Sequence, residues 1–543
     1  MAEPLFAFLR TSRMHPAIAK KTSLSTGKSM ARTAAETLTC LILCAAVMAG
    51  AVAFVYRSGS LLYYGDAEAH FNIARRILDS RSPGYNQIGT VWLPFPHLLM
   101  LPFVSNTGWW VSGLAASMPG VLCFVAAGTM LFAAARRFFG TNAAAAATTA
   151  VFALNPNLLY LQSTPMTEPV FFAAGCGILY CTVAYAQRQS LFWVVGAALF
   201  SLCASLTRYD GWWLIPAVTA YFLVISEKNR LRSAIVFGSI ASAAPVWWLF
   251  HNWLNYGNAL EFYNGHDSAV GIYRRFLEKG GFRYPGDHDW RKAVLYFRTA
   301  AQLVVGTPLM WIGAAGLAIA IVKRVWWPVI LFGLAPVFYV CSMYSSGTPI
   351  FIPQLWPNGY YNTRYGLCML PLLAIGCGAI VTVIPARAGM LAAVVVTIAV
   401  MLPWVAHPTA DAWICWKESQ VNSVQRRTWT KQSADFLRAN YGPGDGAFVQ
   451  FGDDFAGVFR MAGIPLRETL NMGDSPLWMV AQARPDLFLW ETWAVAQSGD
   501  QVQNSMQKAV KDGRFRCVKI VSIKDAPTIE FYRRQLPAPA ALP

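Results

Sequence analysis

Runs of apolar residues long enough to cross a lipid bilayer recur along most of this 543-residue chain. An apolar run of about 18 or more residues is the signature of a transmembrane helix. Hydrophobic residues make up 55% of the chain and charged residues only 13%, which suits a protein embedded in lipid. The sequence therefore predicts a mainly α-helical, polytopic membrane protein. We expect about eleven spans, at 36–57, 109–135, 142–162, 169–187, 191–207, 211–226, 233–254, 299–322, 325–344, 365–384 and 388–406.

Basic residues between these runs give the expected orientation, because Lys and Arg gather on the cytoplasmic side of a membrane. The N-terminal tail, residues 1–34, carries six of them and is predicted to be cytoplasmic. It is too long for a secretory signal peptide, as is the first apolar run. The ends of the even-numbered spans are also basic, at Arg136-Arg137, Arg188, Lys228 to Arg232, Lys323-Arg324 and Arg387. An odd number of spans then places residues 407–543 outside the cytoplasm.

The net charge of +17 has the same origin, since these cations anchor the topology and meet anionic headgroups. No basic face or aromatic–basic module points to nucleic acid, so we expect membrane lipids and no nucleic acid among the partners. The absence of an Asn-x-Ser/Thr sequon favours the bacterial cytoplasmic (inner) membrane. Of the 11 cysteines, only Cys415 and Cys517 fall in the outer block, where they could form a disulfide or stay reduced.

The external parts of the chain have structure of their own. Residues 66–80 show helical periodicity, and residues 91–104 are rich in Trp, Pro and Leu but too short to span. Both segments are predicted to be helices lying in the membrane interface. The block 407–543 alternates helical patterns at 428–441 and 499–511 with strand-like runs at 447–451, 485–490 and 516–521. This alternation predicts a small extracytoplasmic α/β domain.

An acidic motif follows the first span, in the order Asp66, Glu68 and His70. A carboxylate at the mouth of a wet cavity can act as a general base, and Asp66 can equally cap the interfacial helix. On a helix Asp66 and His70 share a face, whereas Glu68 points elsewhere. Asp66, His70 and Glu168 could together hold a divalent metal, Mg²⁺ or Mn²⁺, and no other cofactor is indicated. A solvated helix start explains the same motif.

Other polar residues stand at span ends on the same predicted side. Glu168 opens the fourth span beside Pro169, where an acid also suits the positive end of a helix. Arginine is suited to phosphate, which makes Arg364 and then Arg208 candidates for binding one. The alternative for Arg208 is a local ion pair with Asp210. Weaker substrate-binding candidates are Tyr365, Asp210, Arg274 and His97, and the candidate catalytic carboxylates are Asp66, Glu168 and Glu68.

Together these motifs resemble the GT-C superfamily of membrane glycosyltransferases that use polyprenyl-phosphate sugars. That group includes protein O-mannosyltransferases, lipid A aminoarabinose transferases and oligosaccharyltransferases. The resemblance covers about 36–406 and is carried by Gly65-Asp-Ala-Glu-Ala-His70, Met166-Thr-Glu-Pro169, Thr207-Arg-Tyr-Asp-Gly211 and Asn362-Thr-Arg-Tyr365. The first motif is Asp-x-Glu rather than a plain acidic pair, and its Asp-x-x-x-His form is closer to the metal-dependent oligosaccharyltransferases.

The resemblance implies a hexosyl or pentosyl donor on a polyprenyl phosphate at the outer face, and a glycan, lipid or protein acceptor. Asp66 would act as base or position the acceptor, Glu168 would be the second acid, and Arg364 and Arg208 would hold the lipid phosphate. We expect an inverting transfer. A transporter or flippase for a lipid-linked glycan is the alternative, although its polar groups would sit nearer the bilayer midplane. A third reading, an assembly protein, leaves the acids and arginines without a role.

Overall fold

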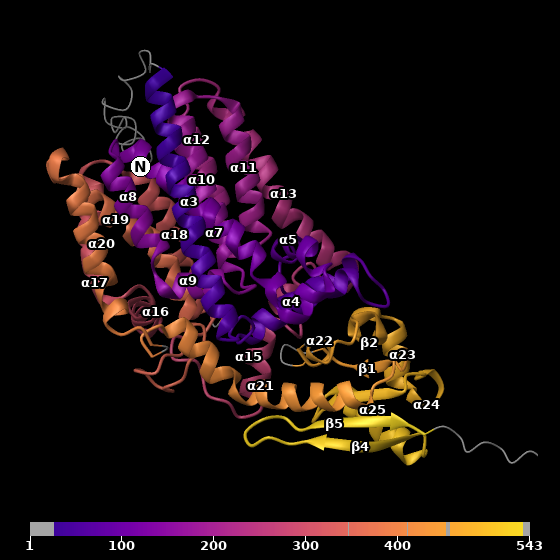
Figure 1. Cartoon of the computed structure of the whole chain (residues 1–543). Helices are drawn as coiled ribbons and strands as arrows, with labels where there is room; N and C mark the ends of the chain where they lie inside the picture. Colours follow the sequence, from indigo (N-terminus) through magenta and orange to yellow (C-terminus); the bar gives the residue numbers. More distant parts are fainter. Residues whose placement is uncertain (1–26, 346, 410, 452–454, 456, 536–543) are drawn as a thin grey trace, which may run out of the picture.

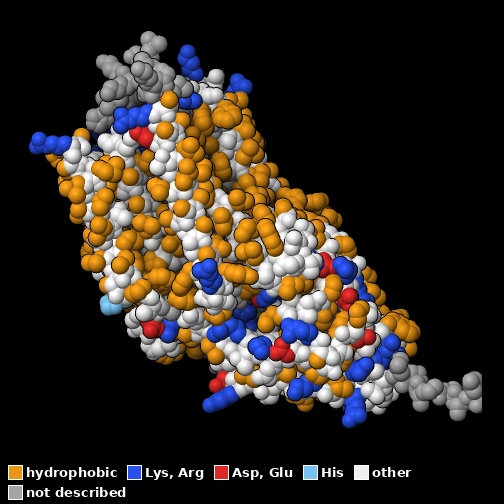
Figure 2. Space-filling view, in the orientation of Figure 1, with side chains coloured by type: hydrophobic (Ala, Val, Ile, Leu, Met, Phe, Trp, Pro, Cys, Tyr) orange, Lys and Arg blue, Asp and Glu red, His pale blue; other side chains and the backbone are white. Residues whose placement is uncertain are grey.

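The computed structural model describes residues 27–345, 347–409, 411–451, 455 and 457–535. Residues 1–26 of the predicted cytoplasmic tail, with Arg10, Arg13, Lys20 and Lys21, lie outside the described residues. Figure 1 shows a long bundle of helices with the strands gathered at one end. Hydrophobic side chains cover much of the bundle surface, and charged side chains concentrate toward the strands (Figure 2). The chain therefore has an apolar membrane half and a polar C-terminal domain.

Seven helices among the described residues are long and apolar enough to cross a membrane. They are α3 (Gly27–Arg57), α7 (Met118–Phe139), α10 (Glu168–Arg188), α13 (Arg230–Tyr256), α18 (Trp326–Tyr344), α19 (Met369–Val381) with the preceding 3₁₀ turn η3 (Thr363–Cys368), and α20 (Gly389–Ala406).

Two further spans are bent. Helices α8 (Asn142–Ala153) and α9 (Pro156–Gln162) meet at 65°, and α16 (Trp290–Val305) and α17 (Thr307–Val322) meet at 105°. At the first break, Asn155 caps α9 and Pro156 is its first residue. At the second, sharper break, Gly306 adopts a φ of +87°, which glycine allows.

The predicted count of eleven spans is supported only as far as seven to nine. Every predicted span coincides with a helix or a bent pair. However, the runs predicted at 191–207 and 211–226 form the shorter apolar helices α11 (Leu191–Ser205) and α12 (Asp210–Ile225). The predicted span 299–322 begins inside α16, whereas the straight apolar helix starts only at Thr307. The full count of eleven stays a prediction.

Small residues let the helices of the membrane half pack closely. A Cβ added to Gly316 of α17 would lie 1.9 Å from the carbonyl oxygen of Gly376 on α19, so only glycine fits there. The most enclosed spans are α10 and the η3–α19 segment, each with 83% of its apolar window buried inside the protein. These two segments carry Glu168 and Arg364, so two predicted site residues stand on the most rigidly packed part of the bundle.

Short helices form a shelf at the end of the bundle that faces the C-terminal domain. The first predicted interfacial helix is α4 (Gly65–Leu78) and the second is α5 (Phe95–Val104), which confirms both as helices. The shelf continues in η1 (Tyr85–Ile88), α6 (Thr107–Ser112) and η2 (Leu114–Ala116). The connection between α13 and α16 contains α14 (Glu261–Asn264) and α15 (Ala269–Glu278).

The C-terminal domain begins with the long helix α21 (Ile414–Asn440), which runs from the bundle to the sheet (Figure 1). Its sheet has the strand order β2-β1-β3-β5-β4, parallel among β2, β1 and β3 and antiparallel among β3, β5 and β4. The strands are β1 (Ala447–Val449), β2 (Thr469–Leu470), β3 (Trp493–Gln497), β4 (Phe515–Val521) and β5 (Ile529–Arg534). The remaining helical elements are α22 (Gly457–Ala462), η5 (Leu466–Glu468), η6 (Met472–Asp474), α23 (Leu477–Ala483), α24 (Pro485–Phe488) and α25 (Gln501–Lys511).

One detail of the predicted domain is wrong, and one question that the sequence left open is answered. The strand expected at 485–490 is the short helix α24, because Pro485 occupies a helix start, and the strand follows at β3. The optional disulfide is absent: Cys415 and Cys517 are both free thiols. Cys415 is buried in the core of the membrane half, whereas Cys517 lies on strand β4 of the sheet.

Candidate active site

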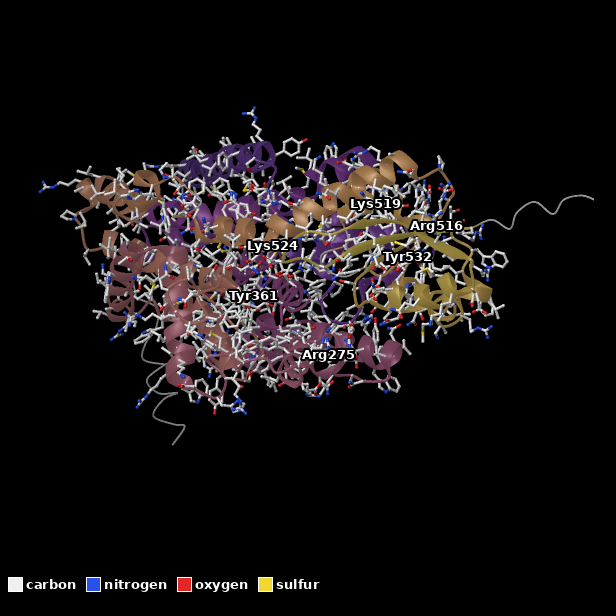
Figure 3. The ribbon with its side chains drawn as sticks, turned by 90° about the horizontal axis from the view of Figure 1, so that it is seen from below. Arg275, Tyr361, Arg516, Lys519, Lys524 and Tyr532 are labelled. Atoms are coloured by element: carbon white, nitrogen blue, oxygen red, sulfur yellow. The ribbon has the colours of Figure 1, made fainter. Side chains whose placement is uncertain are left out.

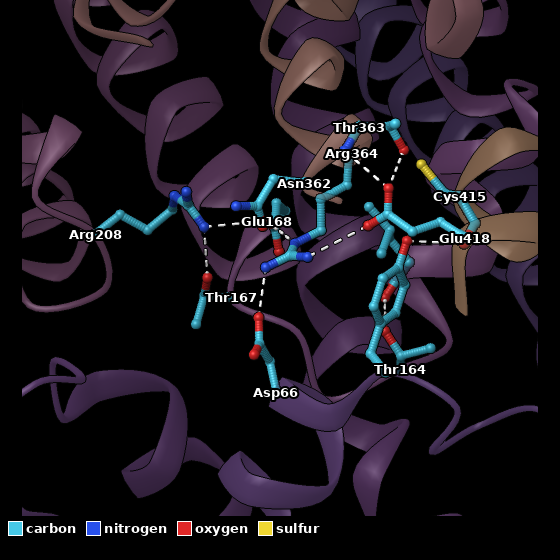
Figure 4. A network of polar contacts seen from close by, with 12 residues as sticks. Asp66, Thr164, Thr167, Glu168, Arg208, Asn362, Thr363, Arg364, Cys415 and Glu418 are labelled. Atoms are coloured by element: carbon cyan, nitrogen blue, oxygen red, sulfur yellow. Dashed lines mark hydrogen bonds and ion pairs between the residues drawn. The ribbon is translucent and has the colours of Figure 1, made fainter. Parts of the chain in front are cut away.

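Arg364 is the centre of a group of three carboxylates that come from three different elements (Figure 4). Its Nη2 lies 2.5 Å from Asp66 Oδ2, its Nε 3.3 Å from Glu168 Oε1 and its Nη1 3.6 Å from Glu418 Oε1. The guanidinium is nearly buried, with 7% of the side chain exposed. Asp66 and Glu168, which are 102 positions apart in the sequence, thus meet at one cation.

Arg208 is the second cation of the group. Its Nη1 lies 3.2 Å from the same Glu168 oxygen that Arg364 contacts, and it donates a 2.7 Å hydrogen bond to the Thr167 hydroxyl. Its Nε lies 3.3 Å from Asp210 Oδ1. The local pair with Asp210 therefore forms as one alternative predicted, but Arg208 also joins Glu168. We call Asp66, Glu168, Asp210 and Glu418 with Arg208 and Arg364 the arginine–carboxylate cluster.

Tyrosine rings surround the two arginines. The guanidinium carbons of Arg364 and Arg208 lie 5.0 Å and 5.3 Å from the centre of the Tyr365 ring. Tyr339 stacks on Tyr365 with ring centres 4.8 Å apart, and its hydroxyl contacts Arg208. The Tyr64 ring lies 5.2 Å from Arg364. These contacts hold both cations by their faces and leave their edges for hydrogen bonding.

Three helices begin at the cluster, and each begins with an acid. Asp66 lies in the first turn of α4, Glu168 opens α10 and Asp210 opens α12. An acid in the first turn interacts favourably with the helix dipole, which explains locally why each helix starts there. The three starts also aim positive helix ends at one point, an arrangement that suits an anion.

The cluster contains more carboxylates than cations. Four carboxylates face two guanidinium groups, and Glu168 Oε2 is buried without a hydrogen-bond partner among the described residues. Asp66 is the solvent-exposed carboxylate of the cluster, with 36% of its side chain exposed against 6% for Glu168. The cluster therefore opens to water at Asp66. A ligand phosphate arriving there would meet two arginines whose present partners are carboxylates.

Glu418 is a member that sequence reasoning missed. It comes from α21, and its Oε2 accepts a 2.8 Å hydrogen bond from the Thr363 amide and another from the Thr363 hydroxyl. Burial raises the pKa of Glu418 above its ordinary value, although Arg364 opposes the rise. The one available signal is weak: an acid that follows the aromatic pair Trp413 and Trp416 at the start of a polar helix.

Glu68, predicted to be catalytic, lies outside the cluster. Two residues along an α-helix turn a side chain by about 200°, so Glu68 leaves α4 on the side opposite Asp66. There it forms a bidentate pair with Arg460 of α22, at 2.8 Å and 2.9 Å. This pair links α4 to the C-terminal domain and places Glu68 away from Asp66, and a catalytic role for Glu68 stays a prediction.

His70 and His97 bind each other instead of a ligand. The rings are buried, and His70 Nδ1 lies 2.9 Å from His97 Nε2. Burial, with a further effect of Arg364 and Arg208, lowers the pKa of His70 to about 3. Burial also holds the pKa of His97 well below its ordinary range. The predicted substrate contact of His97 is thus replaced by a neutral pair that packs α4 against α5.

The residues predicted to bind a metal do not fit one. No group of three His, Cys, Asp or Glu among the described residues is placed to hold a metal ion. Asp66 and Glu168 share Arg364, a cation where a metal would have to lie, and His70 is engaged by His97. We therefore assign no step to a metal.

Arg274 has an exposed side chain on α15 and makes no hydrogen bond or ion pair with the cluster among the described residues. Its neighbour Arg275 lies on the same helix, at the side of the molecule away from the C-terminal sheet (Figure 3). The substrate-binding assignment of Arg274 is therefore not supported. Arg364, Arg208, Tyr365 and Asp210 are brought together as expected, and whether they bind substrate stays a prediction.

Comparison with known proteins gives two kinds of match. Residues 106–250, which include Glu168 and Arg208, match the family model described as dolichyl-phosphate-mannose-protein mannosyltransferase. The fold matches ArnT from Cupriavidus metallidurans bound to undecaprenyl phosphate, with a TM-score of 0.54 and 16% identity over 90% of this chain and 97% of that chain. It also matches the apo state of the same protein, with a TM-score of 0.51 and 15% identity over 86% and 93% of the two chains.

No curated protein sequence matches the chain. The structural likeness is one of fold, and the family model adds a sequence match over about a quarter of the chain. Together they confirm the predicted resemblance to the GT-C superfamily.

Proposed function

We propose that the protein is an integral membrane glycosyltransferase that takes a sugar from a polyprenyl-phosphate donor. The observation that carries the proposal is the meeting of Asp66 with Arg364 and Glu168 at the outer end of the bundle. It puts a candidate base and a candidate phosphate ligand in direct contact. The undecaprenyl phosphate in the ArnT structure supports the donor class, and the mannosyltransferase family model supports sugar transfer.

Charge suggests how the site is switched on. Without a donor, the carboxylate of Asp66 is paired with Arg364 and is therefore not free to face an acceptor. A donor phosphate is a better match for the guanidinium fork, and it would take the place of Asp66. Asp66, already in contact with water, would then be released next to the sugar. Donor binding and base activation become one event.

The transfer itself is a single displacement. The acceptor oxygen bonds to the anomeric carbon of the sugar while the bond from that carbon to the phosphate oxygen breaks. The acceptor proton passes to Asp66, and the electron pair of the broken bond leaves with the polyprenyl phosphate. Arg364 and Arg208 stabilise the phosphate as its negative charge grows. One displacement inverts the anomeric configuration, and an oxocarbenium-like centre forms between base and phosphate.

The proposed setting is the bacterial cytoplasmic membrane, with the N-terminus in the cytoplasm and the C-terminal domain outside. The acceptor is a glycan, lipid or protein on the outer face. The sugar, hexosyl or pentosyl, enters on its polyprenyl carrier in the same leaflet as the cluster.

The test is transfer of radiolabelled sugar from a panel of polyprenyl-phosphate sugars by purified protein. We expect transfer by the wild type and a loss of about 10²-fold to 10⁴-fold in Asp66→Asn, the usual contribution of a general base. Asp267→Asn makes the same chemical change on an exposed loop and should leave the rate unchanged. A chelator arm tests for a metal. Absence of transfer from every donor by well-folded protein would support the transporter alternative.

A further inference from the structure

A hollow separate from the arginine–carboxylate cluster lies beside residues 61–63, the segment of chain that leads to Asp66. It is a pocket of about 500 Å³ between the outer end of α3, α6 and the C-terminal helices α21 and α22. A pocket of this size is within the usual range for a small-molecule site, about 300–1,000 Å³. Four basic side chains and a single acidic one line it. The basic ones are Arg426, Arg427, Lys431 and Arg460.

The cations of this pocket are only partly neutralised: Lys431 forms an exposed ion pair with Asp435 at 3.1 Å, and Arg427 has no carboxylate partner among the described residues. Its one acid, Glu68, is fully engaged by Arg460. Arg427 stacks on Tyr63, with its guanidinium carbon 4.1 Å from the ring centre, and donates to the Tyr63 hydroxyl. The Thr430 hydroxyl has no hydrogen-bond partner among the described residues, although only 6% of that residue is exposed. The pocket thus offers cations and a buried unpartnered hydroxyl to an anionic ligand.

A separate apolar hollow of about 190 Å³ lies elsewhere along the same two helices, α3 and α21. Phe54 and Val55 line the apolar hollow, and the next residue, Tyr56, lines the basic pocket. Trp413 and Trp416 from α21 close the apolar side. Helix α3 lies at the edge of the bundle, where only 28% of its apolar window is buried. Lys and Arg side chains gather where the apolar face gives way to the C-terminal domain (Figure 2).

We infer that these two hollows form a binding site for a phosphate-bearing anionic lipid, with its headgroup in the basic pocket and a chain in the apolar hollow. Charge complementarity favours a lipid as the occupant. So does the order of the lining, with basic side chains beside the C-terminal domain and apolar side chains at membrane depth. A soluble phosphate would satisfy the cations but would leave the apolar hollow unused.

This lipid site is distinct from the arginine–carboxylate cluster. Tyr63 and Glu68 face the basic pocket, whereas Tyr64 and Asp66 face Arg364. Arg426 of the basic pocket also donates to the backbone carbonyls of Leu62 and Tyr63, so it holds the strand of chain that leads to Asp66. A lipid bound there would brace the loop from behind.

The test measures lipid binding, which needs no sugar transfer and is independent of the proposed function. Native mass spectrometry of the detergent-purified full chain would compare phosphatidylglycerol with phosphatidylcholine of the same chain length. We expect preferential binding of phosphatidylglycerol, and at least about a tenfold weaker binding in the Arg427→Ala, Lys431→Ala double variant, which equals about 1.4 kcal/mol. The matched control is Arg516→Ala, Lys519→Ala on the exposed face of β4 (Figure 3).

Each outcome decides the matter. Equal phosphatidylglycerol binding in the wild type and the pocket variant would overturn the inference, as would an equal loss in the β4 control. Loss of binding in Arg364→Gln would assign the lipid to the arginine–carboxylate cluster instead. Displacement of the lipid by inorganic phosphate or glycerol phosphate at equal concentration would show a site for soluble anions. If the double variant does not fold, Arg427→Gln, which keeps most of the side-chain volume, carries the test.

Discussion

Helix α4 separates two sets of buried charges that follow opposite rules. On one side, three carboxylates at the junction with the C-terminal domain are paired with arginines: Glu68 with Arg460, Asp79 with Arg75 and Arg467, and Glu491 with Arg81. We call these the docking pairs. On the other side, the arginine–carboxylate cluster has two cations for four acids and one carboxylate oxygen without a partner among the described residues.

The difference distinguishes charges that hold the two parts of the protein together from charges that a ligand could engage. A buried charge network with every member satisfied rigidifies a structure, whereas an incompletely satisfied one is typical of a functional site. The docking pairs fix where the domain sits. The cluster keeps a surplus of negative charge that an incoming ligand can rearrange. Both sets are built from the same two residue types, so composition alone does not tell them apart.

The largest effect on stability is expected at the docking pairs. Glu68→Gln leaves the Arg460 guanidinium nearly buried without its carboxylate, and breaking a buried pair costs about 3–5 kcal/mol. Limited proteolysis and the unfolding midpoint of the purified protein measure this loss. Asp486→Asn, which removes an exposed partner of Arg484, should change neither. A catalytic role for Glu68 would instead appear as a slow but fully stable variant.

The next effect is on the reaction, at the centre of the cluster. Arg364→Gln should lower kcat for sugar transfer by about 10²-fold to 10³-fold, because it removes a charged donor to the departing phosphate. Arg364→Lys restores the charge without the fork and should recover part of the rate. Arg516→Gln on β4 is the matched control. An unchanged kcat in Arg364→Gln would remove this residue from the chemistry.

The histidine pair, which joins α4 to α5, predicts a pH effect. The pKa of His70 is about 3 in the folded protein and about 6.5 in the unfolded chain, so the unfolded state binds the extra proton between these values. Stability is therefore present above pH 6.5 and is lost as the pH falls, by about 2 kcal/mol from pH 6.5 to 5.

Unfolding midpoints measured between pH 7 and 5 check this dependence. His70→Gln keeps a polar group against His97 and should flatten the slope. An identical slope in the variant would mean that other groups dominate acid unfolding.

The smallest effect comes from the surplus charge of the cluster. Glu168→Gln removes one negative charge beside both arginines, and the donor phosphate should then bind about tenfold more tightly, equal to about 1.4 kcal/mol. The Michaelis constant for the donor, measured with saturating acceptor, is the readout. A rise in that constant would contradict the surplus-charge account, whereas a lower kcat would show a separate catalytic role for Glu168.

The sequence could place those site residues that lie at or near the ends of predicted spans. Asp66, Glu168, Arg208 and Arg364 all stand where an apolar run begins or ends on one predicted side, and topology alone brings such residues to one layer. Glu418 could not be found this way, because its position depends on how α21 packs against η3. The partner of Glu68 lies 392 residues away in the chain, and no local pattern indicates it.

The elements show the same limit. The sequence predicts long apolar helices such as α3 and α10 correctly, because length and apolar composition alone determine that such a run is helical. The short runs at α11 and α12 have the right composition but not the length, so their status depends on neighbours. In the C-terminal domain, Pro485 turned an expected strand into a helix start, and the tertiary pairing of β3 with β1 and β5 moved the strand forward.

Helix α21 has one more consequence, for dissecting the molecule. It begins in the core of the membrane half, delivers Glu418 to Arg364 and ends against the sheet. A protein shortened at residue 407 would therefore lose a carboxylate from the arginine–carboxylate cluster along with the domain. The two halves cannot be exchanged with those of a relative as separate modules, because the boundary between them runs through the site.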